Sequence, residues 1–151
     1  MLYKLESYGI SGKLFAWIGA FLNNRSQCVV IDHCFSYVST VLSGVPQGSV
    51  LGPILFLIFI NDLESICCGE ASIMLFADDA KLYSRIDIDQ PSISLQHSLD
   101  RLSIWADSWQ LAINISKCCV LSTGSNKAVF CNKYYLGKNL VPSASYTLDL
   151  G

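Results

Sequence analysis

The chain has 151 residues, of which 52% are hydrophobic and only 15% charged, and its formal net charge is −2. This length suits one domain, or most of one, with a buried core. The charge balance argues against a small nucleic-acid-binding module that acts through a strongly basic face. Soluble domains usually carry about a quarter charged residues, so we expect a piece of a larger protein, truncated at both ends, with apolar surface meant for neighbours.

The first third of the chain combines helical and strand patterns. Residues 2–8 predict the end of a helix, stopped by Gly9, and residues 12–23 predict a second helix. The apolar face of this second helix, at helical spacing, consists of Leu14, Trp17, Ile18 and Phe21. Residues 27–31 and 35–42 predict two strands joined by a turn at 32–34.

The remainder alternates between helices and strands. A Gly/Pro-containing loop precedes a strongly apolar helix over 50–66, for which Ser49 is the expected cap and Pro53 lies in the first turn. The other predicted elements are a β-hairpin over 72–86, an amphipathic helix over 92–110, a turn and short strand over 111–123, and strands near 129–130 and 134–136. This order predicts one α+β domain over residues 1–151, with helices packed on an antiparallel sheet.

Two adjacent carboxylates lie at the tip of the predicted hairpin. Asp78 and Asp79 follow the apolar run 73–77, and a strand-like pattern resumes at once after them. Neighbouring negative charges repel each other, and a bound divalent cation offsets that cost. Asp78 and Asp79 are therefore candidate metal ligands, with Asp78 the more direct one because successive strand residues point to opposite faces. Solvated turn aspartates are the alternative.

The loop Ser43–Ser49 is the second unusual segment. Its glycines Gly44 and Gly48 allow the backbone to approach a ligand closely, and Pro46 restricts the loop. The amide groups at the start of the helix that follows suit a phosphate or a base. An ordinary turn before a helix explains the glycines and the proline but not Gln47.

Other residues of interest have structural explanations. Trp105 and Trp109 share the apolar stripe of the 92–110 helix, so we expect core packing rather than base stacking. The seven cysteines include no Cys-x-x-Cys, which argues against a zinc site or disulfide framework. The apolar run 50–60 is too short to span a bilayer, which needs about 20 helical residues. We expect a reduced intracellular protein that is not bound to membranes.

The segments Gly44–Leu63, Phe76–Asp79 and Asn114–Lys117, in this order, resemble the palm of a reverse transcriptase of non-LTR (LINE-like) retrotransposons. The resemblance extends from about Leu2 to Gly151 and implies RNA-directed DNA polymerisation by two-metal nucleotidyl transfer. It implies Mg²⁺, with Mn²⁺ as a substitute, and as partners an RNA template, a DNA primer, dNTPs and the other parts of a larger polyprotein. It also implies a cytoplasmic and nuclear location.

The resemblance also suggests roles for individual residues. Asp78 and Asp79 would be catalytic metal ligands, and Gly44, Pro46, Gln47 and Gly48 would contact nucleotide and template. Lys117 matches a lysine thought to lie near the pyrophosphate leaving group, although it could equally be a surface residue. Residues 149–151 resemble the start of the segment leading to the primer grip.

The family's third catalytic aspartate belongs to a motif that would precede residue 1, and Asp32 is expected to be a turn residue instead. We therefore expect this segment alone to be inactive. A non-catalytic retroelement relic, with at most an interaction role, is the alternative. A metal-dependent hydrolase is disfavoured, because no His or Glu ligands accompany the paired aspartates.

Overall fold

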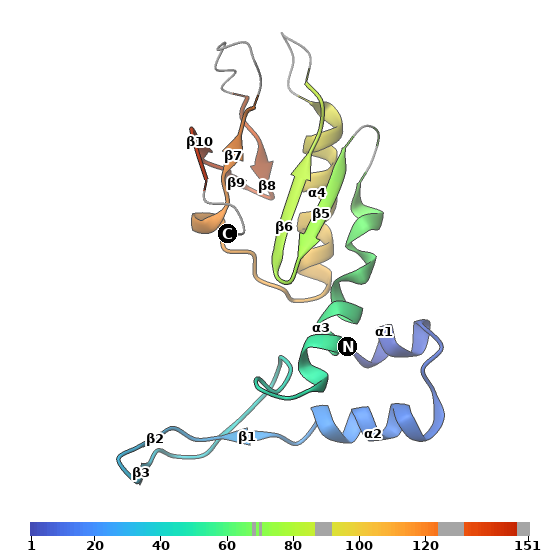
Figure 1. Ribbon diagram of the computed structural model, residues 1–151, viewed down its shortest axis with the longest axis vertical. Coiled ribbons are helices and arrows are strands. Elements are labelled where there is room, and N and C mark those ends of the chain that lie inside the picture. The colour runs from blue at the N-terminus through green and yellow to red at the C-terminus, as the bar shows by residue number, and fades with distance from the viewer. Residues whose placement is uncertain (68, 70, 87–91, 124–131, 148–151) are drawn as a thin grey trace. The chain divides into compact units, whose positions relative to one another are not determined.

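The computed structural model describes residues 1–67, 69, 71–86, 92–123 and 132–147. The chain divides into two compact units, Met1–Asn61 and Asp62–Gly151. Figure 1 shows that helices and short strands occur in both units. The mixed α+β class is therefore confirmed, while the single partial domain over residues 1–151 stays a prediction.

The first unit is built around a small apolar core between its helices. These helices are α1 (Leu2–Ser7), α2 (Gly12–Leu22) and α3 (Leu51–Ile60). Each contributes one buried side chain to the core, namely Leu5, Ile18 and Leu55. Burying a side chain of this size stabilises a fold by about 1.5–3 kcal/mol, so these contacts hold the three helices together.

The apolar face predicted for α2 is only partly covered. Ile18 is buried, but Leu14 and Trp17 are each 55% exposed. The Trp17 ring stacks on Phe21 at a centroid distance of 6.2 Å. The helical spacing therefore identified the correct face of α2, but only part of this face packs against the described residues.

A two-stranded arm, residues 26–42, connects α2 to α3 (Figure 1). Its antiparallel pairs are β1 (Ser26–Gln27) with β4 (Ser39–Thr40) and β2 (Val30–Ile31) with β3 (Cys34–Phe35). Between these pairs, residues 28–29 face residues 36–38, which makes a bulge. The Val29 amide donates to the Ser36 hydroxyl there, over 2.9 Å. The predicted hairpin is confirmed, and the bulge divides each of its strands in two.

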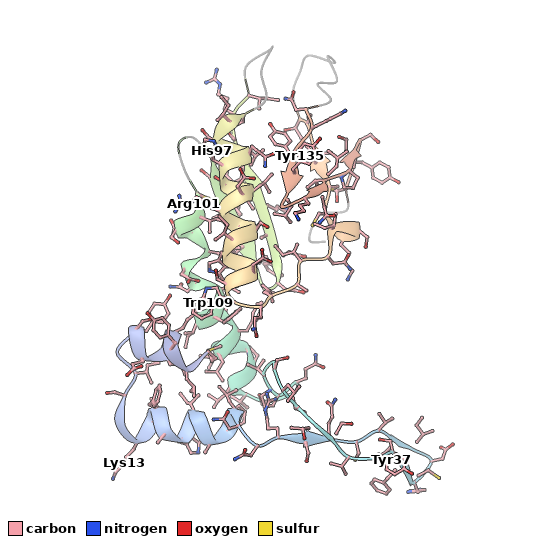
Figure 2. All side chains as sticks on the ribbon, turned by 180° about the vertical axis from the view of Figure 1, so that it is seen from behind. Lys13, Tyr37, His97, Arg101, Trp109 and Tyr135 are labelled. Atoms are coloured by element: carbon pink, nitrogen blue, oxygen red, sulfur yellow. The ribbon has the colours of Figure 1, made fainter. Side chains whose placement is uncertain are left out.

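Much of the arm's apolar surface is exposed. Tyr37, within the bulge, is 98% exposed and is labelled in Figure 2. The other exposed large apolar side chains of the arm are Val29, Val30, Ile31, Phe35, Val38 and Leu42. Contiguous exposed apolar surface of this kind marks interaction sites in soluble proteins.

The chain continues from α3 directly into the 3-10 helix η1, Asn61–Ile66. The predicted helix over 50–66 is thus α-helical only as far as Ile60, and tighter 3-10 turns are common at such ends. Neither this helix nor any other in the described part of the chain has the length and apolar character needed to cross a bilayer.

Helix α4, Ile93–Ser108, organises the second unit and confirms the predicted amphipathic helix. It contacts β6 (Asp79–Tyr83) and β8 (Tyr135–Leu136), and its buried residues are Ser98, Leu102, Trp105 and Ala106. Figure 2 labels Arg101 on this helix, Trp109 directly after its last residue, and Tyr135 on β8. Trp105 is buried, and its indole N–H donates to the Asp62 carboxylate over 3.1 Å. This residue is part of the core.

Polar side chains of α4 form hydrogen bonds with the end of η1 and with β8. The guanidinium of Arg101 donates to the carbonyls of Ser65 and Cys67, where η1 ends. The Gln96 side-chain amide both donates to the Tyr135 carbonyl and accepts from the Tyr135 amide, each over 2.9 Å. These contacts satisfy backbone groups of η1 and β8 that would otherwise need water.

The strands of the second unit pair two at a time within the described residues. These strands are β5 (Ser72–Phe76), β6, β7 (Val120–Leu121), β8, β9 (Asn139–Leu140) and β10 (Ser143–Ala144). The β5–β6 and β8–β9 pairs are antiparallel, whereas β7–β10 is parallel. The predicted strand near 129–130 lies outside the described residues. The larger antiparallel sheet stays a prediction.

Replacing Ser92 by alanine is expected to lower the free energy of unfolding by about 1 kcal/mol, the usual cost of removing an N-cap. The Ser92 hydroxyl accepts from the Leu95 amide at the start of α4 over 3.2 Å. Urea denaturation followed by circular dichroism measures the change. Ser108→Ala is the matched control, because its hydroxyl donates to the Ile104 carbonyl within α4, at the exposed end of the helix, and caps no helix start. Equal losses in the two variants would contradict the capping role.

Candidate active site

The loop Gly44–Ser49 is fixed on the first turn of α3 by short contacts. The Ser49 hydroxyl donates to the Pro46 carbonyl over 2.7 Å and accepts from the Gly52 amide over 3.0 Å. Gly44 and Gly48 have φ angles of 80° and 77°, in the left-handed region that favours glycine. Ser49 therefore bonds an amide in the first turn of α3, but the residue at the N-cap position is Val50 and not the predicted Ser49.

Gly52 lets the loop lie this close to the helix. A Cβ atom at this position would be 2.9 Å from the Pro46 carbonyl oxygen and 2.9 Å from the Ser49 hydroxyl oxygen. The Val45 side chain also packs against the core cluster of the first unit. These contacts fix the backbone of the loop against α3 and the core cluster, while Gln47 and Gly48 remain exposed.

The paired aspartates lie at the tip of the β5–β6 hairpin. The register pairs Phe76 with Asp79, so Ala77 and Asp78 form the turn between the strands. Ala77 has a φ of 49°, which is uncommon for a residue other than glycine. Asp32, in the turn between β2 and β3, has a similar φ of 47°, so this conformation reflects a tight turn between antiparallel strands. The sequence predicted the hairpin correctly, and Asp78 is the turn residue while Asp79 begins β6.

Both carboxylates are accessible. Asp78 and Asp79 are exposed, and neither carboxylate forms a hydrogen bond or an ion pair with any described residue. The register places Ile73 opposite Leu82, and both are half-buried, whereas Met74 and Phe76 on the alternate positions are 61% and 63% exposed. The hairpin therefore has one open face, shared by Phe76 and Asp79, and an aspartate pair free to take a ligand at its tip.

Lys117 ends the short 3-10 helix η2, Ile115–Lys117, in the same unit as the hairpin. Asn114 caps this turn, since its side-chain oxygen accepts from the Ser116 amide over 3.1 Å and from the Ser116 hydroxyl over 2.7 Å. The Lys117 side chain is exposed. The turn chemistry thus presents a positive charge to solvent, which agrees with either alternative considered for this lysine.

The neighbouring Cys118 behaves as a structural thiol. Burial raises the pKa of the Cys118 thiol, with a smaller contribution from Cys119. The Cys118 thiol donates to the Asn114 carbonyl, 3.3 Å away. This agrees with a reduced, unreactive cysteine.

The described residues contain no group of three or more His, Cys, Asp or Glu that could hold a metal ion. Asp78 and Asp79 offer hard carboxylate oxygens, but no third His, Cys, Asp or Glu among those residues joins them in such a group. Residues 149–151, singled out in the sequence, lie outside the described residues.

Sequence patterns did not single out two residues that shape the loop. Gly52 was overlooked because a glycine inside a helical run has no motif of its own, although the helix cost of about 1 kcal/mol signals a packing reason. Arg25 was overlooked because a charged residue shortly after a helix looks like a surface residue. Its guanidinium reaches the carbonyls of Ser43 and Gly44.

Comparisons with known proteins agree with the resemblance seen in the sequence. A family model described as "Reverse transcriptase (RNA-dependent DNA polymerase)" matches residues 1–140. The RNA-directed DNA polymerase from mobile element jockey of Drosophila funebris is 39% identical over 125 residues, covering 78% of this chain. The corresponding protein of Drosophila melanogaster is 30% identical over 148 residues, covering 93% of this chain.

A third similar protein is the probable RNA-directed DNA polymerase from transposon BS of Drosophila melanogaster, 33% identical over 135 residues and 81% of this chain. The matched region is a small part of these relatives, 14%, 16% and 14% of their lengths in the order given. No solved structure matches the chain significantly.

Proposed function

We propose that the protein containing this chain copies RNA into DNA for a retrotransposon, because the chain belongs to the reverse transcriptase (RNA-dependent DNA polymerase) family. In this proposal the chain supplies part of the polymerase palm, in which its strands belong to a larger antiparallel sheet covered by helices. The observation that carries the proposal is the exposed, unpaired aspartate pair at the tip of the β5–β6 hairpin.

The residues at the hairpin tip fit a magnesium ion. Mg²⁺ prefers a few carboxylate oxygens together with water and substrate phosphates, and Mn²⁺ accepts similar ligands. Asp78 and Asp79 offer such oxygens on a tight turn between paired strands, which restricts their positions. When bound, the metal ions of such a site activate the primer hydroxyl and neutralise charge on the triphosphate.

The fixed loop is the proposed contact to template and incoming dNTP. Gly44, Pro46 and Gly48 set its backbone, and the exposed Gln47 has donors and an acceptor for base or sugar edges. Lys117, exposed on η2, is the proposed stabiliser of the leaving pyrophosphate through its positive charge. An RNA template, a DNA primer, dNTPs and the remaining parts of a polyprotein are the proposed partners. A cytoplasmic and nuclear location is proposed on the same basis.

Primer extension tests this function. The polymerase that contains this segment should extend a DNA primer on an RNA template with dNTPs and Mg²⁺, and excess EDTA should stop it until Mg²⁺ is restored. Complete absence of extension under all metal conditions, by a folded protein, would instead favour the non-catalytic relic.

We propose that residues 1–151 expressed alone do not extend a primer, because the described residues complete no metal site of three or more ligands. Primer extension by this segment is measured as the incorporation of labelled dNTP in the presence of Mg²⁺ or Mn²⁺. Extension above the background of an Asp78→Asn segment would show that the missing ligand lies within the segment.

A further inference from the structure

Arg25 joins the end of α2 to the beginning of the candidate nucleotide-binding loop. Its Nε donates to the carbonyl of Leu22, the last residue of α2, over 2.8 Å. Its Nη2 donates to the carbonyls of Ser43, over 3.5 Å, and of Gly44. One half-buried side chain therefore contacts two segments that are separated in sequence by the whole arm.

The backbone of Arg25 holds the same strand. Its carbonyl accepts from the Val41 amide over 2.9 Å, next to the β1–β4 pair. Arg25 thus binds the chain at Val41 through its main chain and at Ser43 and Gly44 through its side chain. The strand that leads into the loop is fixed immediately before the loop starts.

The chemistry of these contacts requires arginine. The guanidinium carries five N–H donors in a planar fork, so it can reach carbonyls on two sides at once, and its charge complements the carbonyl end of a helix. A lysine keeps the charge but presents it as a flexible point, without the fork. Since Ser49 and Gly52 fix the other end of the loop, loss of the Arg25 fork frees only the Gly44 end.

We propose that Arg25 is a positioning residue for nucleotide binding, which aligns Pro46, Gln47 and Gly48 by holding the Gly44 end of the loop. The inference rests on the proposed function of this loop. Arg25 does not itself touch the substrate, so its removal should weaken nucleotide binding more than it slows the chemical step. A misplacement on the order of 1 Å in such a contact lowers activity by up to about a hundredfold.

Arg25→Lys in the polymerase that contains this segment tests the inference through the kinetic constants for one dNTP on an RNA template. We expect KM to rise about tenfold with kcat within about threefold of the unsubstituted enzyme, the pattern of lost substrate binding. The matched control is Lys13→Ala, which removes a positive charge from the exposed side of α2 (Figure 2) and should change neither constant.

A double variant shows whether Arg25 acts through the loop. Gln47→Ala should raise KM by itself, and adding Arg25→Lys should raise it little further, because coupled residues are not additive. A fall in kcat and melting temperature with unchanged KM, or fully additive effects, would overturn the proposal. Arg25→Gln is the second variant if the lysine variant is unstable, and failure of both to fold would assign Arg25 a purely structural role.

The Asp78→Asn enzyme separates this inference from the function on which it rests. An active Asp78→Asn enzyme would refute the proposed catalytic site. An inactive one, together with an Arg25→Lys enzyme of unchanged KM, would refute only the positioning role of Arg25.

Discussion

Replacing Asp78 by asparagine is expected to reduce primer extension by about a thousandfold or more, since metal stabilisation of the transition state amounts to several kcal/mol and each ~1.4 kcal/mol is a factor of ten. Asparagine has nearly the same size as aspartate but lacks the charge that binds a cation. Asp78 is exposed in a turn and bonds no described residue, so the fold should be unaffected. Single-nucleotide extension under saturating dNTP measures the rate.

Asp32→Asn is the matched control for this substitution. Asp32 also lies in a tight turn between antiparallel strands, β2 and β3, and has a φ of 47°, a conformation that asparagine tolerates well. This variant should extend primers at the normal rate. Asp79→Asn should cause a smaller loss than Asp78→Asn, because Asp79 begins β6 and is not the turn residue. Normal extension by Asp78→Asn would refute its assignment as a metal ligand.

Gly52→Ala should lower kcat/KM for dNTP by about ten- to a hundredfold, because small displacements of positioning groups have effects of this size. The new Cβ would be 2.9 Å from the Pro46 carbonyl oxygen, and this backbone atom can move only if the loop moves. Alanine is otherwise about 1 kcal/mol better than glycine inside a helix. Steady-state extension at varied dNTP concentration, combined with a melting curve, measures both effects.

Gly19→Ala provides the same chemical change in a helix without the close contact. A Cβ at Gly19 in α2 would lie 3.9 Å from the Leu2 side chain, which is ordinary packing distance. This variant should keep normal kinetics and equal or higher stability. If Gly52→Ala were as active as Gly19→Ala, the loop position would not matter for nucleotide use.

Local patterns predicted most elements correctly. Period-3.6 apolar spacing located α2 and α4, and the apolar runs on either side of the aspartate pair located the β5–β6 hairpin. These signals are local, since side chains within a few residues decide which face of a helix or strand is apolar. The Ser92 cap of α4 follows from the same kind of local pattern, whereas the N-cap of α3 is Val50 and not the predicted Ser49.

The details of strand pairing and of helix type could not be predicted from the sequence. The bulge in the arm depends on how residues 28–29 meet residues 36–38, and the parallel β7–β10 pair joins segments far apart in the sequence. Likewise, the 3-10 helix η1 that follows Ile60 ends where Arg101 of another helix contacts the carbonyls of Ser65 and Cys67. Each of these depends on long-range contacts that override weak local preferences.

By itself, the sequence determined which carboxylates, glycines and lysine this chain carries and in what order, and hence its family. The tertiary structure alone decided which of them are accessible and what holds them, namely the open hairpin tip at Asp78, the close approach at Gly52 and the Arg25 contacts to Leu22 and Gly44. The physical reason is that side-chain identity is encoded residue by residue. Exposure and hydrogen-bond partners instead arise only when distant segments pack together.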